Sequence, residues 1–516
     1  MRKLSVILLI VTICSFFILG ARFSPALAQY TWDNTPFVES HWVNNGFFHT
    51  GTDYRKINTD NEVVNESFGV STKIPGVEGA FAVVATDDIG GVYVAYQSHW
   101  EENSSEVGNR HVYFAYSHDY GANWSKSYRV NDNGSLSVLC DSPSIAIDQN
   151  TGHIFVAWKD NRTGVAKVYI DKSINRGVSF GADNIVHDWL HDYVEPWLPY
   201  TTNLKISDDG TIYIVWVAYY EYSFPNSTLF FTRSDDGGQT FNPPTTIYPM
   251  EGERFVHPYI AIENNDVLYV VYVRRNTTSA SVYLTKSQNG GSSFGTPVTV
   301  RDVTTGRYCG GPKASVAVDG TIHVVWTDAR AGDGTQYFDI YYATSEDGGL
   351  SFTPNLRVND DLVATPPSTH PHFTRGAQGT PAIVTDSNST VHVFWEDFRN
   401  FVTDTTYCRD IYYATKNETG FSTNLKVNYV HPDADSVNCA DPNVALDSQD
   451  NFYVTYSDSL SGDNGHHSIY FMFVNTTKQP SESPSPIFGF DLIPILTALL
   501  IVLVFTQKKS KSSRLF

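Results

Sequence analysis

Three copies of one short motif carry charged and aromatic side chains that could do chemistry. The motif Trp-x-Asp-x-Arg begins at Trp158, Trp326 and Trp395. A guanidinium can hold a carboxylate or a sulfate through two parallel hydrogen bonds, so three arginines in similar positions could form an anion-binding ring. This interpretation predicts a ligand-binding face that contains Asp160, Arg162, Asp328, Arg330, Asp397 and Arg399.

The same motif also permits a purely structural interpretation. Asp339 and Asp410 each begin an Asp-Ile-Tyr stretch, and these stretches open the strands that follow Arg330 and Arg399. An Arg–Asp pair across each hairpin would close the turn without any ligand. Both interpretations stay open at this point. Glu195 lies in a predicted loop and is a further candidate for the ligand-binding face, because functional side chains concentrate on loops.

The motifs fall within a repeat that predicts the elements positioning them. Short apolar stretches that end in an aromatic residue recur seven times, at intervals of 54 to 69 residues. Each interval fits one four-stranded sheet with its turns, and the continuous apolar runs fit strands covered on both faces. We therefore predict an all-β protein, a β-propeller of seven four-stranded blades, with six blades as the alternative. The stretches are 92–96, 154–158, 212–216, 268–272, 322–326, 391–395 and 452–456.

A second motif, Ser-x-Asp/Asn-x-Gly-x-x-aromatic, recurs five times in register with these stretches. In a tight turn the Asp or Asn accepts backbone N–H groups and the glycine adopts a conformation closed to other residues. The aromatic residue then packs between neighbouring sheets. The predicted turn residues are Asp119, Gly121, Trp124, Asn175, Gly177, Phe180, Asp236, Gly238, Phe241, Asn289, Gly291, Phe294, Asp347, Gly349 and Phe352.

On these five copies the chain resembles the Asp-box (BNR) repeat proteins, the sialidase-like β-propellers, across residues 54–477. The resemblance implies three substrate-binding arginines, a Tyr–Glu nucleophile pair and an Asp acid/base, as in sialidases of this fold. The first of those arginines lies in an Arg-Ile-Pro motif, whereas this chain has Lys73, which cannot make a planar two-pronged contact. We therefore expect a platform that binds a glycan or a surface protein. An exo-glycosidase of sialidase type and a structural cell-coat protein are the alternatives.

The start of the repeat region predicts how the ring closes. The stretch 55–58, Arg-Lys-Ile-Asn, resembles the last strand of several units, while the seventh unit ends near Thr477 without such a strand. We therefore predict that residues 55–58 supply the outer strand of the seventh blade, which pairs the two ends of the propeller and removes an exposed edge.

The two ends of the chain predict export and membrane anchoring. A basic start is followed by an apolar run and an Ala-Leu-Ala cleavage site, as in a signal peptide. Near the other end, twenty mostly apolar residues are followed by lysines, as in a membrane-spanning helix with a cytoplasmic tail. The expected protein is a single-pass cell-membrane protein with an extracellular ectodomain. The predicted segments are the signal peptide 1–28, an N-terminal extension 29–53, the propeller 54–477, a Pro/Ser linker 478–486, the membrane helix 487–506 and the basic tail 507–516.

Charge and cysteine content limit the partners. The chain has 55 Asp and Glu against 35 Lys and Arg, which argues against a nucleic-acid partner. We expect a monomeric ectodomain without a cofactor or compact metal motif, although an acidic exported chain is compatible with structural calcium. Cys408 and Cys439 are predicted in neighbouring blades, and outside the cell we expect them to form a disulfide. No geometric argument pairs Cys140 with Cys309.

Overall fold

The computed structural model describes most of the repeat region, all of it within one compact unit, Asn45–Phe516. The segment 1–70, which includes the whole of a second unit, Met1–Asn44, lies outside the described residues, as does 476–516. The described ranges are 71–76, 78–98, 110–132, 139–164, 166–186, 202–219, 227–250, 253–276, 279–303, 308–330, 338–360, 380–397, 409–428, 437–460 and 467–475.

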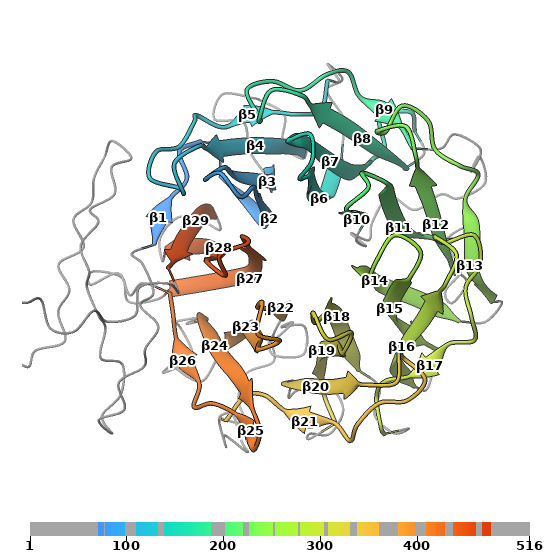
Figure 1. Cartoon of the computed structure of the whole chain (residues 1–516). Helices are drawn as coiled ribbons and strands as arrows, with labels where there is room; N and C mark the ends of the chain where they lie inside the picture. Colours follow the sequence, from blue (N-terminus) through green and yellow to red (C-terminus); the bar gives the residue numbers. More distant parts are fainter. Residues whose placement is uncertain are drawn as a thin grey trace, which may run out of the picture. The chain divides into compact units, whose positions relative to one another are not determined.

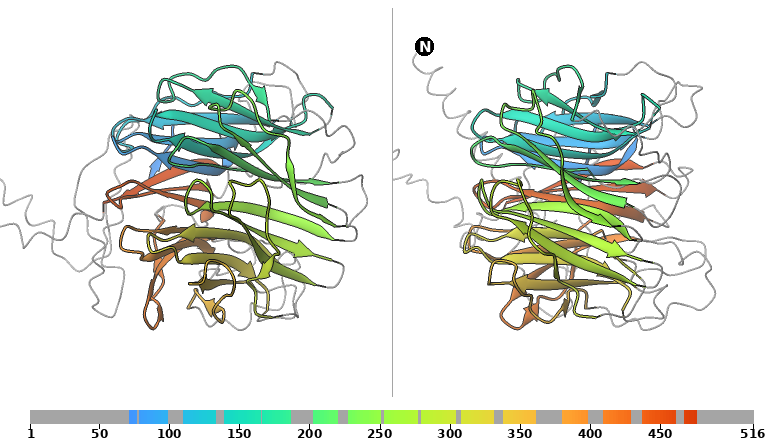
Figure 2. Two further views of the ribbon diagram at one scale, coloured as in Figure 1. Left: turned by 45° about the vertical axis from the view of Figure 1, so that its right-hand side comes forward. Right: turned by 90° about the vertical axis from the view of Figure 1, so that its right-hand side faces the viewer.

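Seven antiparallel sheets form a ring, so the chain folds as a seven-bladed β-propeller (Figure 1). The first strand of each blade lies nearest the axis, and the strands run roughly along that axis (Figure 2). Blades 1 to 3 comprise β2 (Gly79–Thr86), β3 (Val92–Ser98), β4 (His111–Ser117) and β5 (Tyr128–Arg129); β6 (Cys140–Asp148), β7 (His153–Asp160), β8 (Lys167–Ser173) and β9 (Asn184–Ile185); β10 (Asn203–Ile206), β11 (Ile212–Tyr219), β12 (Ser227–Ser234) and β13 (Thr245–Met250).

The remaining blades repeat this order with small variations. Blade 6 has two short outer segments, β25 and β26, which both pair with β24. Blades 4 to 7 comprise β14 (Arg254–Ile262), β15 (Leu268–Arg275), β16 (Ala280–Ser287) and β17 (Val298–Thr299); β18 (Cys309–Val316), β19 (Ile322–Asp328), β20 (Asp339–Ser345) and β21 (Leu356–Arg357); β22 (Ala382–Thr385), β23 (Val391–Asp397), β24 (Asp410–Asn417), β25 (Gly420–Phe421) and β26 (Leu425–Lys426); β27 (Val437–Leu446), β28 (Phe452–Leu460), β29 (Ser468–Val474) and the N-terminal strand β1 (Thr72–Lys73).

As predicted, an N-terminal strand completes the seventh blade and closes the ring. The prediction that residues 55–58 form this strand is wrong. The outer position of the seventh blade belongs to β1, where Thr72 pairs with Phe471 and Lys73 with Tyr470. The Ile74 N–H then donates to the Ile469 carbonyl at 2.9 Å. Residues 55–58 lie outside the described ranges, and their similarity to outer strands therefore did not identify the closing strand. The short stretch that closes the ring is the one that contains Lys73.

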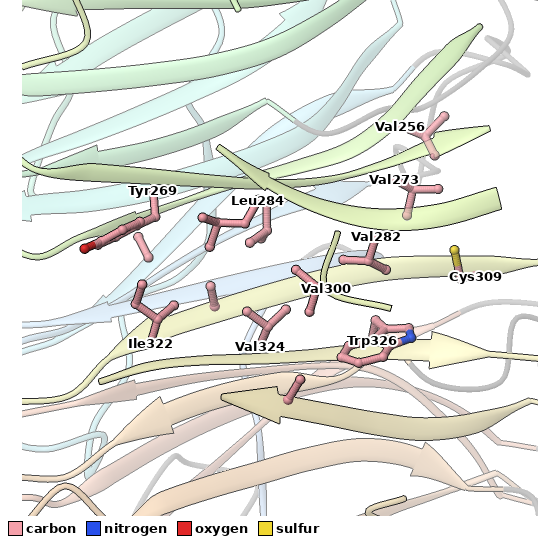
Figure 3. Close-up of a cluster of buried hydrophobic side chains, with 14 of the residues drawn as sticks. Val256, Tyr269, Val273, Val282, Leu284, Val300, Cys309, Ile322, Val324 and Trp326 are labelled. Carbon is pink, nitrogen blue, oxygen red and sulfur yellow. The ribbon is translucent and has the colours of Figure 1, made fainter. Parts of the chain in front are cut away.

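Buried side chains between adjacent blades form the core. The second strand of each blade is covered on both faces, which explains its continuous apolar run. Between blades 4 and 5, one buried cluster contains Tyr269, Leu284, Val324 and the fully buried Trp326, with Tyr269 and Trp326 at opposite ends of it (Figure 3). The repeat therefore stabilises each blade through its neighbours, in the manner of repeat proteins.

The five predicted tight turns have the hydrogen bonds expected of them. In the first, the Ser117 hydroxyl donates to Asp119 at 2.7 Å and accepts the Gly121 N–H at 2.8 Å. Gly121 has a φ of 85°, and a Cβ there would lie 2.2 Å from the Phe471 ring, so both the turn and the packing require glycine. Trp124 stacks edge-on against Phe471 of the neighbouring blade.

The predicted membrane helix lies outside the described residues. Within the described ranges, no helix is long and apolar enough to cross a membrane.

Candidate functional site

In five blades, the innermost strand carries a β-bulge near its first residues. A register shift occurs near the start of β2, β6, β14, β18 and β27. A bulge redirects the side chains that follow it, and left-handed non-glycine residues are uncommon and concentrate at functional sites. The residues at the bulge all have φ between 53° and 55°: Phe81, Ser142, His257, Gly311 and Asp441.

The position two residues further along has a structural role in some blades. Ser144, Asn203 and Asn443 accept a backbone N–H from the innermost strand of the next blade, at 2.8 to 3.0 Å. Tyr259 of β14 and Lys313 of β18 hold the same position in their blades. Tyr259 pairs with Val271 and Lys313 with Val325, and each valine directly precedes the aromatic residue near the end of the second strand. Two consecutive blades therefore have a large ionisable side chain at a position that is Ser or Asn in blades 2, 3 and 7 and apolar, Val83 and Ala382, in blades 1 and 6.

Tyr259 lies between two lysine side chains that come from different blades. The ammonium of Lys205, on β10, lies 5.2 Å from the centre of the Tyr259 ring, and that of Lys313 lies 4.6 Å from it. All three side chains are partly exposed. Burial raises the pKa of the phenol, but the two nearby ammonium groups outweigh it, so the pKa of Tyr259 is lowered. Burial also lowers the pKa of Lys313.

Two carboxyl groups lie on blades 6 and 7, next to this aromatic site. The Thr380 hydroxyl donates to Glu396 at 3.1 Å, and its oxygen is 3.5 Å from a carboxyl oxygen of Asp441. The Asp441 N–H donates to Glu396 at 2.8 Å, while Arg409 reaches the other Glu396 oxygen at 3.3 Å. Burial, followed by the Glu396 charge, raises the pKa of Asp441 to about 7. The field of Asp441 also acts on Lys313, which links the two groups of side chains.

A neutral histidine adjoins the aromatic site. His257, two residues before Tyr259, accepts the Gly311 N–H through Nδ1 at 3.2 Å. Burial, together with the charges of Arg275, Lys313 and Arg254, lowers the pKa of His257 to about 3. His257 is therefore uncharged at neutral pH and can donate or accept a hydrogen bond.

These side chains form the candidate site, which we call the inner-ring cluster. It combines a partly exposed tyrosine ring, two ammonium groups beside that ring and a carboxyl group that binds a proton near neutral pH. An aromatic ring can cover the apolar face of a sugar, and ammonium groups attract carboxylate or sulfate. Its members are Lys205, His257, Tyr259, Lys313, Thr380, Glu396 and Asp441.

The structure places the Trp-x-Asp-x-Arg motifs at the junctions between blades. Asp328 is fully buried and accepts the Trp326 indole N–H at 2.9 Å and the Arg330 Nη2 at 2.7 Å. Arg330 also binds Asp302 and stacks over Tyr341 of the third strand, 4.0 Å from its centre. Burial would raise the pKa of Asp328, but its arginine partners outweigh this and lower it.

The first copy of the motif has the same arrangement. Asp160 is fully buried, accepts the Trp158 indole N–H at 3.2 Å and pairs with Arg162. Arg162 also pairs with Asp183 and stacks over Tyr169 at 4.3 Å. Both arginines are therefore held by carboxylates and aromatic rings toward the outer strands of their blades, and not in a ring at the central mouth.

The third copy and the remaining candidates are only partly described. Asp397 is buried and accepts the Trp395 indole N–H at 3.0 Å, but Arg399 and Glu195 lie outside the described residues. The predicted pair of Arg399 with Asp410 lies partly outside the described residues, and both hairpin aspartates lie near a cation of the fourth strand. The Asp339 carboxylate is 3.8 Å from Arg357, and the Asp410 carboxylate is 2.6 Å from Lys426.

Three cysteines within the described ranges are free, buried thiols. Cys140, Cys309 and Cys439 lie at equivalent positions, each opposite an aspartate at the end of the second strand of its blade. Cys408 lies outside the described residues, and the disulfide predicted between Cys408 and Cys439 is not seen. The three described cysteines belong to the repeated packing.

The inner-ring cluster and one buried cation were not predicted from the sequence. The cation is Arg301, which is fully buried and holds Asp328 through two hydrogen bonds of 2.8 Å. An alignment of the seven units by the terminal aromatic of the second strand would have singled out Tyr259 and Lys313, because no other blade has a large ionisable residue at their position. The Trp-x-Asp-x-Arg motif recurs because it is part of the structural repeat, so its recurrence does not indicate a ligand site.

Comparison with known proteins bears on the fold alone. No family model matches the chain, and no curated protein does. A solved PL25 polysaccharide lyase, an ulvan lyase bound to -[GlcA(1-4)Rha3S]-, aligns with a TM-score of 0.52 and 12% identity over 78% of this chain and 95% of that chain. An α-L-arabinanase from Penicillium chrysogenum (TM-score 0.45, 16% identity, 66% of this chain and 94% of that one) is also similar. So is a sialidase from Streptococcus pneumoniae (TM-score 0.44, 11% identity, 82% and 70%).

Proposed function

We propose that the inner-ring cluster binds an acidic glycan, one with carboxylate or sulfate groups. The observation that carries the proposal is the Tyr259 ring between the Lys205 and Lys313 ammonium groups. A sugar ring could stack on the phenol while its anionic group contacts one or both lysines. Neither lysine forms an ion pair with a carboxylate in the described part of the chain, so both charges are available to a ligand.

Two features of the chain support this assignment. The members of the cluster come from five blades, and most of them lie on the innermost strands β10, β14, β18 and β27, which surround the axis (Figure 1). The ulvan lyase, which has a similar fold, is bound to -[GlcA(1-4)Rha3S]- in its solved structure. That likeness supports the fold, so the ligand class rests on the lysines and the tyrosine. We further propose that residues 1–28 export the chain and residues 487–506 anchor it at the cell surface, and that the Ser-x-Asp/Asn-x-Gly turns make it an Asp-box protein.

The test is a calorimetric titration of the full-length chain with a glucuronate oligosaccharide and with its carboxyl-reduced, neutral counterpart. We expect the acidic probe to bind and the neutral probe to bind at least about tenfold more weakly. Tyr259→Ala should weaken binding of both probes, since it removes the stacking surface. Equal affinity for the two probes would contradict the proposal. Arg330→Ala tests the arginine-face interpretation: loss of binding in a folded Arg330→Ala protein would favour that interpretation.

A second candidate function is glycan cleavage, favoured by the acid–base properties of the cluster. Asp441, with a pKa raised to about 7, can hold a proton at neutral pH and act as a general acid. The lowered pKa of Tyr259 increases the fraction of phenolate, the form of the side chain that can act as a nucleophile. Release of a fluorogenic aglycone from glucuronic- or sialic-acid glycosides, abolished in Asp441→Asn, would establish this activity. Binding without any release would leave the chain as a binding platform.

A further inference from the structure

Three carboxylates converge at the junction between blades 1 and 2. Asp132 follows β5, Asp171 belongs to β8 and Asp183 precedes β9. One oxygen of each lies within 4.8 Å of the others. Ligand oxygens on opposite sides of a calcium ion are separated by about this distance, because each Ca–O bond is about 2.4 Å long.

Two other junctions within the described ranges are each closed by a reciprocal pair of one aspartate and one asparagine, which we call a latch. Between blades 4 and 5, the Asp302 N–H donates to the Asn355 side-chain oxygen at 2.9 Å, and the Asn355 N–H returns a bond of 2.9 Å to Asp302. The Asn355 amide then donates to the Val300 carbonyl at 3.0 Å. Asp360 and Asn424 form the same latch between blades 5 and 6.

At the junction of blades 1 and 2, an aspartate replaces the asparagine. Asp132 and Asp183 keep the two reciprocal hydrogen bonds, at 2.9 and 3.1 Å. Asp183 has no amide to donate to the carbonyl that corresponds to Val300, and its Oδ1 is buried without a hydrogen-bond partner. The substitution therefore removes a donor and leaves an oxygen that needs a cation or proton.

The third carboxylate also occupies a position that is neutral elsewhere. Asp171 corresponds to Ala115, Ala343 and Ala414, and to Thr232, whose hydroxyl donates to the Asn242 carbonyl at 2.6 Å. Asp171 is 3% exposed, and its Oδ2 has no hydrogen-bond partner. A buried, unpartnered carboxylate oxygen beside two other carboxylates indicates a missing positive charge.

The junction of blades 1 and 2 also differs from the junction of blades 4 and 5 in its balance of charged side chains. Around Asp328, the arginines Arg301 and Arg330 face the aspartates Asp302 and Asp328, and the charges balance. Around Asp160, the described residues place Arg162 and Lys167, which lies opposite Asp160 on β8, beside four aspartates, namely Asp132, Asp160, Asp171 and Asp183. The residue that corresponds to Arg301 is Asn131, which is neutral. Among the described residues, carboxylates therefore outnumber cations at the junction of blades 1 and 2.

From these observations we propose that Asp132, Asp171 and Asp183 bind a divalent cation, calcium by the chemistry of the ligands. Calcium prefers an all-oxygen shell of carboxylates, carbonyls and water, and it tolerates irregular geometry. The ion would replace the missing asparagine donor and join blades 1 and 2 close to the start of the ring. This site is separate from the inner-ring cluster, so its failure would leave the proposed glycan site untouched.

The test measures thermal unfolding of the full-length chain in EGTA and in increasing CaCl2, together with calcium stoichiometry by equilibrium dialysis. We expect the midpoint to rise by about 3–6 °C at saturating CaCl2, with a smaller rise in MgCl2. Asp171→Ala and Asp183→Asn should each bind one calcium ion fewer and lose the shift, yet unfold in EGTA at or above the wild-type midpoint. Thr232→Ala, the matched substitution in blade 3, should keep the wild-type calcium response.

Two results would overturn the site. One is a wild-type midpoint that is the same in EGTA and in CaCl2, with no bound calcium that Asp171→Ala removes. The other is an unchanged calcium stoichiometry in both variants, which would place any bound ion elsewhere in the chain.

Discussion

Cations at the blade junctions and cations near the axis of the ring differ in what surrounds them. Arg301 and Arg330 lie within 3 Å of Asp328, which is fully buried between them. Lys205 and Lys313 face a tyrosine ring and have no ion pair within the described ranges. The junction charges therefore hold blades together, whereas the axial charges are available to a ligand. Whether a cation is paired with a carboxylate therefore distinguishes the two groups better than whether it belongs to a recurring sequence motif.

The largest effect is expected on the free energy of unfolding, when a cation is removed from a blade junction. Arg301→Met leaves the buried Asp328 carboxylate with one arginine instead of two, and breaking a buried pair in this way costs about 3–5 kcal/mol. Urea unfolding measures the loss of stability. The affinity for an acidic oligosaccharide should not change in the folded fraction. A stability within about 1 kcal/mol of wild type would mean that Arg330 alone satisfies Asp328.

The next prediction concerns the affinity for an acidic glycan when a cation near the axis is removed. Lys313→Met should lower the affinity for a glucuronate oligosaccharide by about 10- to 100-fold, since a charged hydrogen bond is worth about 1.5–3 kcal/mol. The free energy of unfolding should stay the same or rise, because burial already disfavours the Lys313 charge. Calorimetric titration and urea unfolding of the same preparation separate the two effects. A large loss of stability with unchanged binding would place Lys313 among the structural cations.

The pH dependence of binding sharpens the comparison further. The pKa of Asp441 is raised to about 7, so this carboxyl takes up a proton as the pH falls from 8 to 6. The cluster then becomes more positive, and we expect the affinity for an acidic glycan to rise by about three- to tenfold. The same titration measured in Asp441→Asn should be flat. A wild-type affinity that falls on acidification would reverse the sign and contradict the assigned charge state.

The raised pKa of Asp441 also has a consequence for stability. The folded chain holds this proton up to about pH 7, whereas the carboxyl in the unfolded chain releases it near the ordinary aspartate pKa of 3.8. The contribution of Asp441 to stability is therefore fully present below that lower pKa and declines as the pH rises through the window to about 7. Urea unfolding of wild type and Asp441→Asn across this window should show a steeper decline in the wild type, because Asp171, whose pKa is also raised to about 7, contributes equally to both.

The smallest expected effect concerns an exposed member of a junction. Asp302 pairs with Arg330, but its side chain is 39% exposed. Asp302→Asn keeps an oxygen for the Asn355 N–H, and exposed ion pairs contribute little, so the loss should stay below about 1 kcal/mol. Urea unfolding beside Arg301→Met provides the contrast. A loss as large as that of Arg301→Met would show that exposure does not rank these pairs.

The sequence was sufficient to predict the propeller because its repeat has a local physical cause. Apolar runs such as Val92–Tyr96 must be buried on both faces, and turns such as that at Gly121 require glycine. The blade number and a closing N-terminal strand were therefore predictable. The identity of that strand was not, because β1 has two residues and pairing this short leaves no periodic pattern in the sequence.

The candidate site was harder to predict because its members are far apart in the chain. Lys205, Tyr259 and Lys313 come together only when three blades are placed around one axis, and none belongs to a recurring motif. The Trp-x-Asp-x-Arg motif, by contrast, lies within one hairpin and suggested both a structural and a ligand-binding role. What decides its location is a set of partners from neighbouring strands, such as Asp183 for Arg162.

The most direct test of the central claim is a crystal structure of the protein with a bound glucuronate oligosaccharide. We predict a sugar ring over Tyr259, with its carboxylate within hydrogen-bond distance of Lys205 or Lys313. An oligosaccharide bound instead at Arg162 or Arg330, with the inner-ring cluster unoccupied, would contradict the assigned site and restore the arginine face as the ligand site.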